Sequence, residues 1–303
     1  MRNYILKRLL QLIPLLLGIS LISFFVMHLA PGDPTAMFID PNVNPVELAR
    51  VRANWGLDQP IYIQYFIWLK NAIMLDFGRS YTTGQPVITE LAERLPMTLL
   101  LMIPAFILTF LIAIPVGVIS AVKKNSWFDK TFTFLSFAGM AIPTFWLGLM
   151  LMLVFSVKLH WLPAIGNITL PLITMVIGSL AGLTRYQRAA MLEVLNQDFI
   201  RTARAKGLPE RTVIFKHALR NALIPIVTII GLSLPDLFGG AFIIETIFAW
   251  PGMGRLGVQS IFQRNYPVIM GIVMLSAFLI IIGNLLADIC YGSVDPRIRY
   301  EKK

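Results

Sequence analysis

The chain has 303 residues, of which 56% are hydrophobic and 14% are charged, and its formal net charge at pH 7 is +10. Soluble domains usually carry about 25% charged residues and about 45–50% apolar residues. This composition practically excludes a soluble domain, and the aromatic content of 11% argues against disorder. A disulfide scaffold is excluded as well, because Cys290 is the single cysteine.

Six apolar stretches are long enough to cross a bilayer, whose hydrocarbon core of about 30 Å takes roughly 20 helical residues. The fifth stretch differs from the others because it carries two acidic residues, Asp236 and Glu245. We predict one transmembrane domain, 1–303, with spans at approximately 9–30, 97–122, 131–157, 168–184, 223–249 and 267–291.

The positive charges decide between five and six spans, because Lys and Arg collect in short loops on the cytoplasmic side. With six spans and the N-terminus inside, most of the 26 basic residues lie in inside segments. We therefore predict an all-α polytopic membrane protein with six transmembrane helices and with both termini cytoplasmic. The first span is expected to be a retained anchor, because it exceeds the roughly 7–15 apolar residues of a signal peptide.

The longest outer loop covers residues 31–96. It begins with Pro31-Gly32-Asp33-Pro34, a helix stop and turn signal. Its segments 46–55 and 61–75 mix apolar and polar residues at helical spacing. A small helical cap and a docking surface for an external partner that delivers substrate are both compatible with this pattern.

Residues 185–222 form a cytoplasmic coupling loop that is too polar to span the membrane. It holds eight basic residues against three acidic ones. Three interpretations are open: a helix pair that lies on anionic lipid, a helix-turn-helix that binds DNA, and a lever that fits a groove on a soluble partner. Six membrane spans argue against nucleic acid as the partner.

The middle of this loop predicts two helices that meet at a bend. Phe199, Ile200 and Ala203 fall on one helical face. Gly207 is expected to end the first helix in a left-handed conformation, and Pro209 suits the first turn of the next helix. The pattern therefore predicts a small rigid bracket that projects from two membrane helices.

The acidic residues of the fifth span are candidates for the translocation pathway. A charge near the centre of a membrane helix costs about 2.5–3.5 kcal/mol and tends to face a polar cavity or a partner. Asp236 is the stronger candidate, because Pro235 and Gly239-Gly240 beside it would let the helix kink or pack closely. Glu245 fits better a position near the outer interface, where it is solvated or paired.

The chain lacks the residues that catalysis or phosphate binding would need. It has no G-x-x-x-x-G-K-[ST] phosphate loop, and its three histidines (His28, His160 and His217) have no metal-ligand spacing. We predict no catalytic residue, no metal site and no cofactor bound by this chain. An energy-coupled role would therefore require a separate ATPase.

The run Arg201-Thr202-Ala203-Arg204-Ala205-Lys206-Gly207-Leu208 resembles the coupling-loop motif of bacterial ABC importer permeases. Of the positions that the general importer pattern specifies, only those of Ala203, Gly207 and Leu219 carry the expected residue in this sequence. The variant of the peptide permeases, with Arg in place of a Glu and a downstream proline at Pro225, fits better. Segments 29–34, 76–80, 245–254 and 295–300 are similar to further motifs of the same family. The chain thus resembles the B-type subunit of dipeptide and oligopeptide permeases, whose relatives also carry nickel chelates.

This resemblance implies the type I ABC importer permease architecture and an importer located in the bacterial plasma (inner) membrane. The chain would form half of the translocation pathway beside a second permease chain, for which the resemblance favours a paralogue. Two cytosolic ATPase subunits, which bind ATP and Mg, and an extracytoplasmic solute-binding protein would complete it.

The resemblance also implies which residues dock on the ATPase, namely Phe199, Ile200, Arg201, Thr202, Ala203, Arg204, Ala205, Lys206, Gly207 and Leu208. Within this set we expect Phe199 and Ile200 to form an apolar knob and the basic residues to pair with acidic groove residues. Two other functions remain open. A secondary transporter would predict inverted repeats, and a membrane scaffold would explain the bracket without Asp236.

Overall fold

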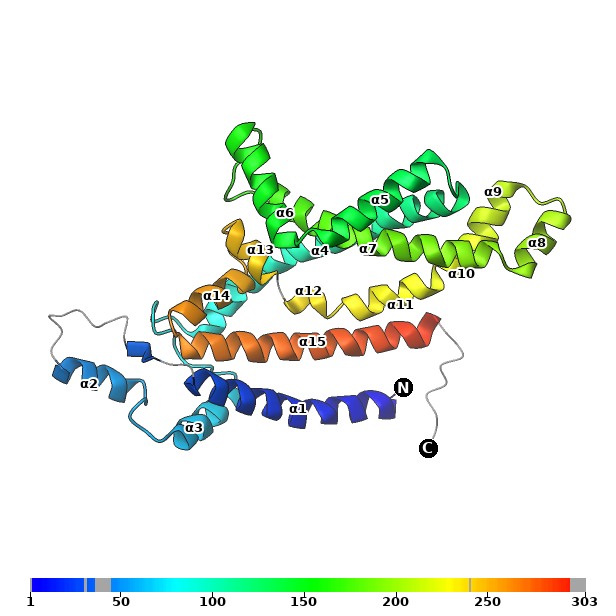
Figure 1. The fold of residues 1–303 in the computed structure, drawn as a ribbon. Helices are drawn as coiled ribbons and strands as arrows, with labels where there is room; N and C mark the ends of the chain where they lie inside the picture. Colours follow the sequence, from blue (N-terminus) through cyan, green and yellow to red (C-terminus); the bar gives the residue numbers. More distant parts are fainter. Residues whose placement is uncertain (1, 30–31, 36–44, 240, 295–303) are drawn as a thin grey trace.

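The computed structural model describes residues 2–29, 32–35, 45–239 and 241–294 (Figure 1). The motif 295–300 and the basic residues after it lie outside the described residues, as do positions 30 and 31 of the opening motif. In the described ranges the secondary structure is helical, apart from one isolated antiparallel bridge between Arg79 and Pro86.

The first half of the chain contains α1 (Arg2–Leu29), α2 (Pro45–Asn54), α3 (Ile61–Ile73), α4 (Val87–Val122), α5 (Trp127–Ala141), α6 (Thr144–Leu151) and the π-helical η2 (Met152–Lys158). The second half contains α7 (Thr169–Leu195), α8 (Asp198–Ala205), α9 (Glu210–Thr212), the π-helical η3 (Val213–Ala218), α10 (Leu219–Ala222), α11 (Ile224–Ser233), α12 (Asp236–Gly239), α13 (Phe242–Ile247), α14 (Met253–Phe262) and α15 (Tyr266–Val294).

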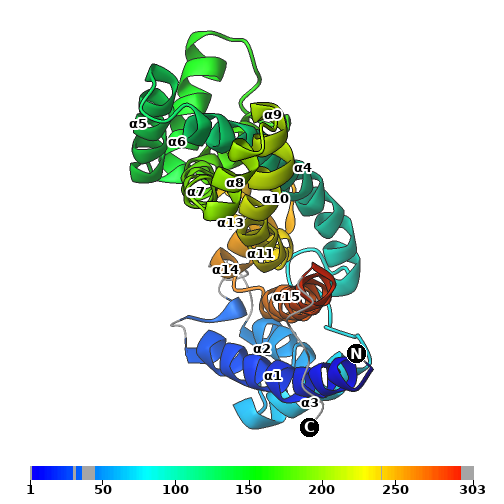
Figure 2. The ribbon, with the colours of Figure 1, turned by 90° about the vertical axis from the view of Figure 1, so that its right-hand side faces the viewer.

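The helices pack around α4 and α7, which make the most extensive contact of the fold. Helix α5 packs on α7, and α1 lies along α15 (Figures 1 and 2). The start of α1, the described end of α15 and α8 lie at one end of the molecule, and α2 and α14 lie at the opposite end. The start of α1 and the described end of α15 therefore lie on the side of the bracket, while the side of the membrane that this end faces stays a prediction.

Three helices are long and apolar enough to cross a membrane by themselves, at Leu10–Leu29, Val87–Val122 and Tyr266–Leu285. Two bent helix pairs, Trp127–Ala141 with Thr144–Lys158 and Glu210–Ala222 with Ile224–Ser233, raise the number to five if each pair is one span. Six spans, and their predicted limits, therefore stay a prediction.

The stretch predicted as one span at 131–157 is not one straight helix. Helices α5 and α6 meet at an angle of 102°. Ile142 precedes Pro143 and has extended backbone angles, φ −87° and ψ 122°. The ring of a proline disfavours the helical conformation of the residue before it, so α5 ends there.

The fifth apolar stretch, 223–249, is also broken, as its prolines predicted. It consists of α11, α12 and α13, and Pro235 lies in the break between α11 and α12. The break packs tightly on α15, because a Cβ on Gly283 would lie 3.0 Å from the Cα of Pro235. A glycine at this contact lets the two backbones approach closely.

The helices expected in the outer loop are present as α2 and α3. Helix α3 is held on α1 by the hydroxyl groups of Tyr65 and Ser20, whose oxygens are 3.0 Å apart. The ring of Trp55, after α2, stacks on Tyr81 at a centroid distance of 4.0 Å. Helix α3 is therefore packed on α1, and the end of α2 contacts the segment that precedes α4.

A buried ion pair ties α5 to α7 near the bracket. The Nε and Nη2 atoms of Arg188 donate to the two carboxylate oxygens of Asp129 at 2.6 and 2.8 Å. The backbone N–H of Asn125 donates to the same carboxylate at 2.9 Å. The Asp129 side chain is 4% exposed, so its charge depends on these donors.

We predict that Asp129→Asn lowers the free energy of unfolding by about 2 kcal/mol, because it leaves the partly buried Arg188 charge without its partner. Thermal unfolding in detergent micelles measures the change. Lys130→Gln removes a charge from an exposed neighbour and should leave the stability unchanged. In a double-mutant cycle with Arg188→Gln, additive losses would contradict the pairing.

Candidate functional site

The bracket predicted in the inside loop is formed by α8, α9, η3 and α10. It projects beyond the end of α7 (Figure 1). A buried apolar cluster joins it to α4 and α7, and this cluster consists of Val118, Ala121, Met191, Ile200, Ala203, Val213, Ala218 and Ala222. The bracket is therefore packed on the membrane helices at its base, so that a displacement of α8 would act on α4 and α7.

The bend of the bracket has the hydrogen bonds of a Schellman motif, the common C-terminal cap in which a left-handed residue follows the helix. The N–H of Gly207 donates to the carbonyl of Arg204 at 2.9 Å, and that of Leu208 donates to Ala203 at 3.4 Å. Gly207 has φ +72°, which confirms the expected left-handed conformation. No heavy atom lies within 4 Å of a Cβ built on Gly207, so the backbone conformation alone favours glycine there.

The exposed face of α8 differs from the predicted one. Ile200 is 0% exposed and Ala203 is 7% exposed, because both belong to the cluster at the base of the bracket. Phe199 is 44% exposed and Leu208 is 36% exposed. The apolar knob assigned to Phe199 and Ile200 is corrected accordingly: Ile200 anchors α8 to the membrane helices, and Phe199 and Leu208 are the accessible large apolar side chains of residues 199–208.

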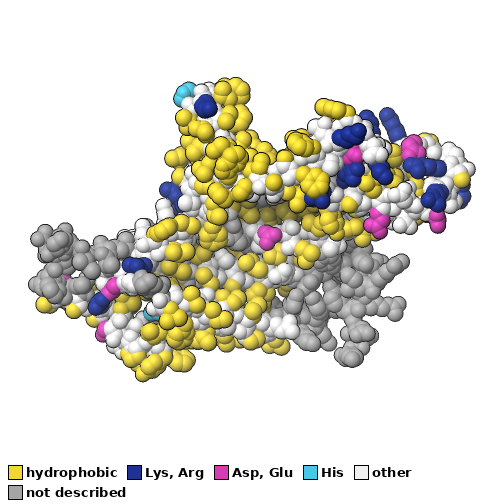
Figure 3. All heavy atoms as spheres, viewed as in Figure 1, with side chains coloured by type: hydrophobic (Ala, Val, Ile, Leu, Met, Phe, Trp, Pro, Cys, Tyr) yellow, Lys and Arg dark blue, Asp and Glu magenta, His cyan; other side chains and the backbone are white. Residues whose placement is uncertain are grey.

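The Lys and Arg side chains of the bracket are exposed, and two of them already have acidic partners within it: Arg201 donates to Asp198 at 3.4 Å, and Arg204 pairs with Glu210. Lys and Arg side chains gather over the end formed by α8 and α9 (Figure 3). Arg204 donates to both carboxylate oxygens of Glu210, at 3.2 and 2.6 Å, and this hydrogen bonding raises the pKa of Arg204. The ion pair closes the bend from α8 to α9. Of the predicted docking cations, Arg201 and Lys206 are exposed as well.

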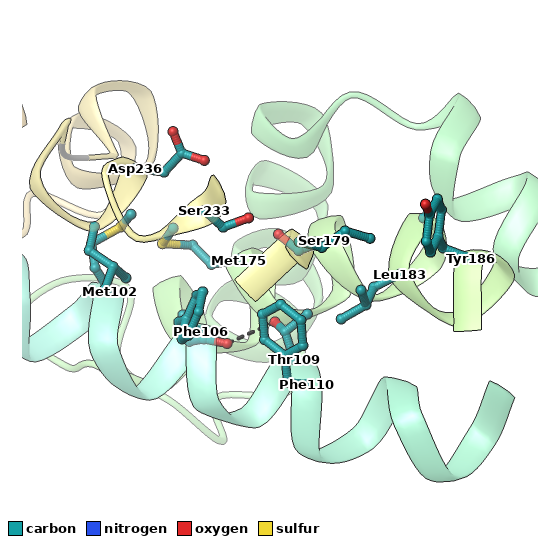
Figure 4. Close-up of a pocket in the computed structure, with 14 residues that line it drawn as sticks. Met102, Phe106, Thr109, Phe110, Met175, Ser179, Leu183, Tyr186, Ser233 and Asp236 are labelled. Carbon is teal, nitrogen blue, oxygen red and sulfur yellow. Dashed lines mark hydrogen bonds between the residues drawn. The ribbon is translucent and has the colours of Figure 1, made fainter. Parts of the chain in front are cut away.

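A second feature is a cavity of about 360 Å³ (Figure 4). It lies between α4, α7, α11 and α12. Its lining is mainly apolar and includes Met102, Ala105, Phe106, Thr109, Phe110, Met175, Ser179, Gly182, Leu183, Tyr186, Ile229, Ser233, Asp236 and Leu237. Small-molecule sites have volumes of about 300–1,000 Å³ and few polar groups, so the cavity suits a small ligand.

Asp236 lies in this cavity, at the break between α11 and α12. In Figure 4 its carboxylate lies at one end of the labelled lining and Tyr186 lies at the other end. The Asp236 side chain is exposed. Among the residues that the structure describes, none donates a hydrogen bond or an ion pair to this carboxylate. The structure thus places the predicted pathway acid in a cavity.

Glu245 occupies a different environment, since it is 0% exposed and each of its carboxylate oxygens accepts a hydrogen bond. The hydroxyl of Thr98 donates to its Oε1 at 2.9 Å, and the backbone N–H of Arg255 donates to its Oε2 at 3.1 Å. Thr98 also accepts from the N–H of Met253 at 2.8 Å. Glu245 therefore binds the N-terminus of α14 to α4, where the positive end of the helix dipole favours an anion.

The packing around this carboxylate requires glycine. A Cβ on Gly252 would lie 2.4 Å from Oε2 of Glu245. The cavity of Asp236 does not include Glu245. A structural role of Glu245, as a hydrogen-bonded link between α4 and α14, accounts for these contacts. A role of Glu245 in the translocation pathway stays a prediction.

Sequence reasoning missed the cavity residues of α4 and α7. Thr109, Ser179 and Tyr186 lie in stretches that we predicted only as apolar spans or loop. Isolated hydroxyl residues inside such spans were the available signal. Their common face becomes evident only when α4, α7 and α11 are placed beside one another.

Two family models match the chain. Residues 113–300 match the binding-protein-dependent transport system inner membrane component, and residues 1–102 match the N-terminal part of such membrane components. Together these matches cover most of the chain.

The chain is also similar over its full length to curated proteins. It is 48% identical to the oligopeptide transport system permease protein AppB of Bacillus subtilis (strain 168), over 99% of this chain and 100% of that protein. It is 40% identical to the glutathione transport system permease protein GsiC of Escherichia coli (strain K12), over the same shares of the two chains.

Among solved structures, an inward-facing conformation of the MetNI methionine ABC transporter matches with a TM-score of 0.61 and 21% sequence identity. The match covers 70% of this chain and 100% of that chain. At this identity the likeness shows a shared fold.

We predict that Glu245→Ala lowers the free energy of unfolding by about 3 kcal/mol, because it leaves two donors without an acceptor and opens a void. Thr98→Val should have an effect of the same sign, because it removes the acceptor of the Met253 N–H. Asp236→Ala serves as the matched control at an exposed position. Thermal unfolding in detergent measures all three variants, and equal stability of Glu245→Ala and Asp236→Ala would contradict the structural role of Glu245.

Proposed function

Because the chain belongs to the family of binding-protein-dependent transport system inner membrane components, and is therefore a permease subunit of an ABC importer, we propose that it carries peptides into the cell. The observation that supports this most strongly is the identity of 48% to an oligopeptide permease over nearly the whole chain. Glutathione, the solute in the name of the second relative, is itself a tripeptide. Short peptides are thus the class of solute that both names share.

The importer would contain further subunits. A second permease chain, preferably a paralogue, would supply the other half of the pathway. Two cytosolic ATPase subunits would bind ATP and Mg, and an extracytoplasmic solute-binding protein would deliver the peptide. The complex would lie in a bacterial inner membrane. A self-contained secondary transporter or a scaffold does not fit the family to which the chain belongs.

The bracket would couple the ATPase to the membrane helices. Phe199 and Leu208 would enter an apolar part of a groove on the ATPase, and Arg201 and Lys206 would face acidic residues beside it. Ile200, buried at the base, would transfer the displacement of α8 to α4 and α7. Coupling thus requires a rigid bend, which the Schellman motif and the Arg204–Glu210 pair support.

The cavity beside α11 would form part of the pathway. The cavity is open, and Asp236 is the one acidic residue among those that line it. It also lies beside the break in the fifth apolar stretch. Breaks in membrane helices are tolerated where they line a cavity, and transporter sites are often built at such breaks. Movement of α7 against α4 and α11 would change the access to this cavity.

Reconstitution tests the function as a whole. The chain, co-expressed with the second permease chain and the ATPase subunits of the same organism, should co-purify with them. The complex should support ATP-driven uptake of short peptides into liposomes that also contain the binding protein. A complex that hydrolyses ATP but takes up no peptide would overturn the proposed solute.

Gly207 variants test the bend. We predict that Gly207→Val reduces coupled uptake several-fold, because φ +72° costs a β-branched residue about 1–2 kcal/mol. Gly207→Asn is the matched control, since asparagine tolerates the left-handed region. Peptide uptake and stimulation of ATP hydrolysis are the measurements. Wild-type values in Gly207→Val would contradict a coupling role of the bend.

Phe199 and Ile200 test the corrected docking face. We predict that Phe199→Ala weakens co-purification of the ATPase without changing the thermal stability of the permease. Ile200→Ala should instead lower the free energy of unfolding by about 2–5 kcal/mol, because it empties a buried site. If Ile200→Ala weakened ATPase binding while the permease remained as stable as the wild type, the corrected face would be wrong.

A further inference from the structure

The carboxylate of Asp236 lacks a partner at a place where a charge is costly. Asp236 lies halfway along the predicted span 223–249. No group in the described part of the chain donates to it, and the lining of the cavity contains no Lys, Arg or His. A charge at the centre of a membrane protein is typically paired or faces a pathway for a charged solute. We therefore infer that the partner of this carboxylate is a cation that enters the cavity from outside the chain.

The chemistry of the lining favours an organic ammonium group over a metal ion. Divalent cations prefer several oxygen or nitrogen ligands, and groups of three or more acidic, His or Cys side chains do not occur in the described residues. The cavity supplies one carboxylate. It also supplies the rings of Phe106, Phe110 and Tyr186, whose faces attract organic cations and apolar groups.

The rest of the lining suits side chains of varied shape. Met102 and Met175 face the cavity from α4 and α7 (Figure 4). Methionine is unbranched and polarizable, so it adapts to different apolar partners. The hydroxyl of Thr109 already donates to the carbonyl of Ala105 at 2.7 Å, so it can only accept from a ligand. The hydroxyls of Ser179 and Ser233 are further polar groups of the lining.

We propose that this cavity binds the amino-terminal residue of the transported peptide, with its α-ammonium group on the Asp236 carboxylate and its side chain between Met102, Phe106 and Met175. The proposal rests on the proposed peptide function. Peptides of different sequence share a free α-ammonium group and differ in their side chains. A fixed carboxylate beside adaptable methionines recognises the shared group and accepts the variable one.

The test uses the assembled permease–ATPase complex without the solute-binding protein, so that the selectivity of that protein does not enter. The probe is a dipeptide with a diazirine-bearing photo-methionine at its first position and alanine at its second. The matched probe is the same dipeptide with an acetylated amino group. Covalent labelling after illumination is located by mass spectrometry.

We expect the free-amine probe to label segments of α4 and α7 at the cavity at least tenfold more than the acetylated probe, which corresponds to about 1.4 kcal/mol. Asp236→Asn should remove this difference, and Asp236→Glu should retain it. Lys130→Gln, a change of charge on an exposed residue outside the cavity, should retain it too. Thermal unfolding and co-purification verify that each variant folds and assembles.

Equal labelling by the two probes in the wild type would overturn the proposal, and so would labelling outside the cavity. Loss of assembly with the second permease chain in Asp236→Asn would also overturn it, because the carboxylate would then pair with that chain. Each of these results leaves the permease function intact if the wild-type complex still takes up peptide. Absence of ATP-driven peptide uptake by the wild type would instead overturn the proposed function.

Discussion

The close packing of α4 against α7 determines the positions of both the bracket and the cavity. A Cβ on Gly117 would lie 2.8 Å from the Cβ of Gln187, so this contact brings the two helices closer than larger side chains would allow. The apolar cluster that holds α8 begins at Val118, directly after Gly117 on α4, and at Met191, about one turn after Gln187 on α7. The cavity lies on the other side of the contact, towards the middle of α4 and α7. In the proposed function, a force on the bracket would reach the helices that line the cavity through this packed interface.

Two acidic residues of the same apolar stretch have different environments, and the difference indicates a structural role for one and a ligand-binding role for the other. Glu245 is buried, accepts two hydrogen bonds and orders the start of α14. Asp236 is exposed to a cavity and has no partner among the described residues. Since a membrane supplies no water to an unpaired charge, the first arrangement stabilises the fold and the second leaves a charge available to a ligand. The residues that flank these two acids already favoured Asp236 for the pathway and a solvated or paired position for Glu245, but only the structure identified the donors to Glu245.

Breaks in the helices have local causes that sequence reasoning recognised only in part. Pro235 and the glycines beside it predicted a break in the fifth stretch, and α11 and α12 are separated there. The angle of 102° at Pro143 was missed, because a proline in an apolar stretch is equally compatible with a kinked membrane helix. Composition and length cannot distinguish a mild kink from a sharp bend, since the angle depends on the helices that pack on either side.

The sequence by itself determined the membrane class, the family and the bend at Gly207. These follow from composition, from a series of motifs in a given order and from a local backbone preference, none of which needs distant contacts. Only the tertiary structure decided that Ile200 faces inward and Phe199 outward. The two residues are adjacent on a short helix, and the surface against which the helix packs determines which of them is buried. It also decided which acid is satisfied and which is not, because the donors to Glu245 come from α4 and α14, and the lining around Asp236 comes from helices that are remote in the chain.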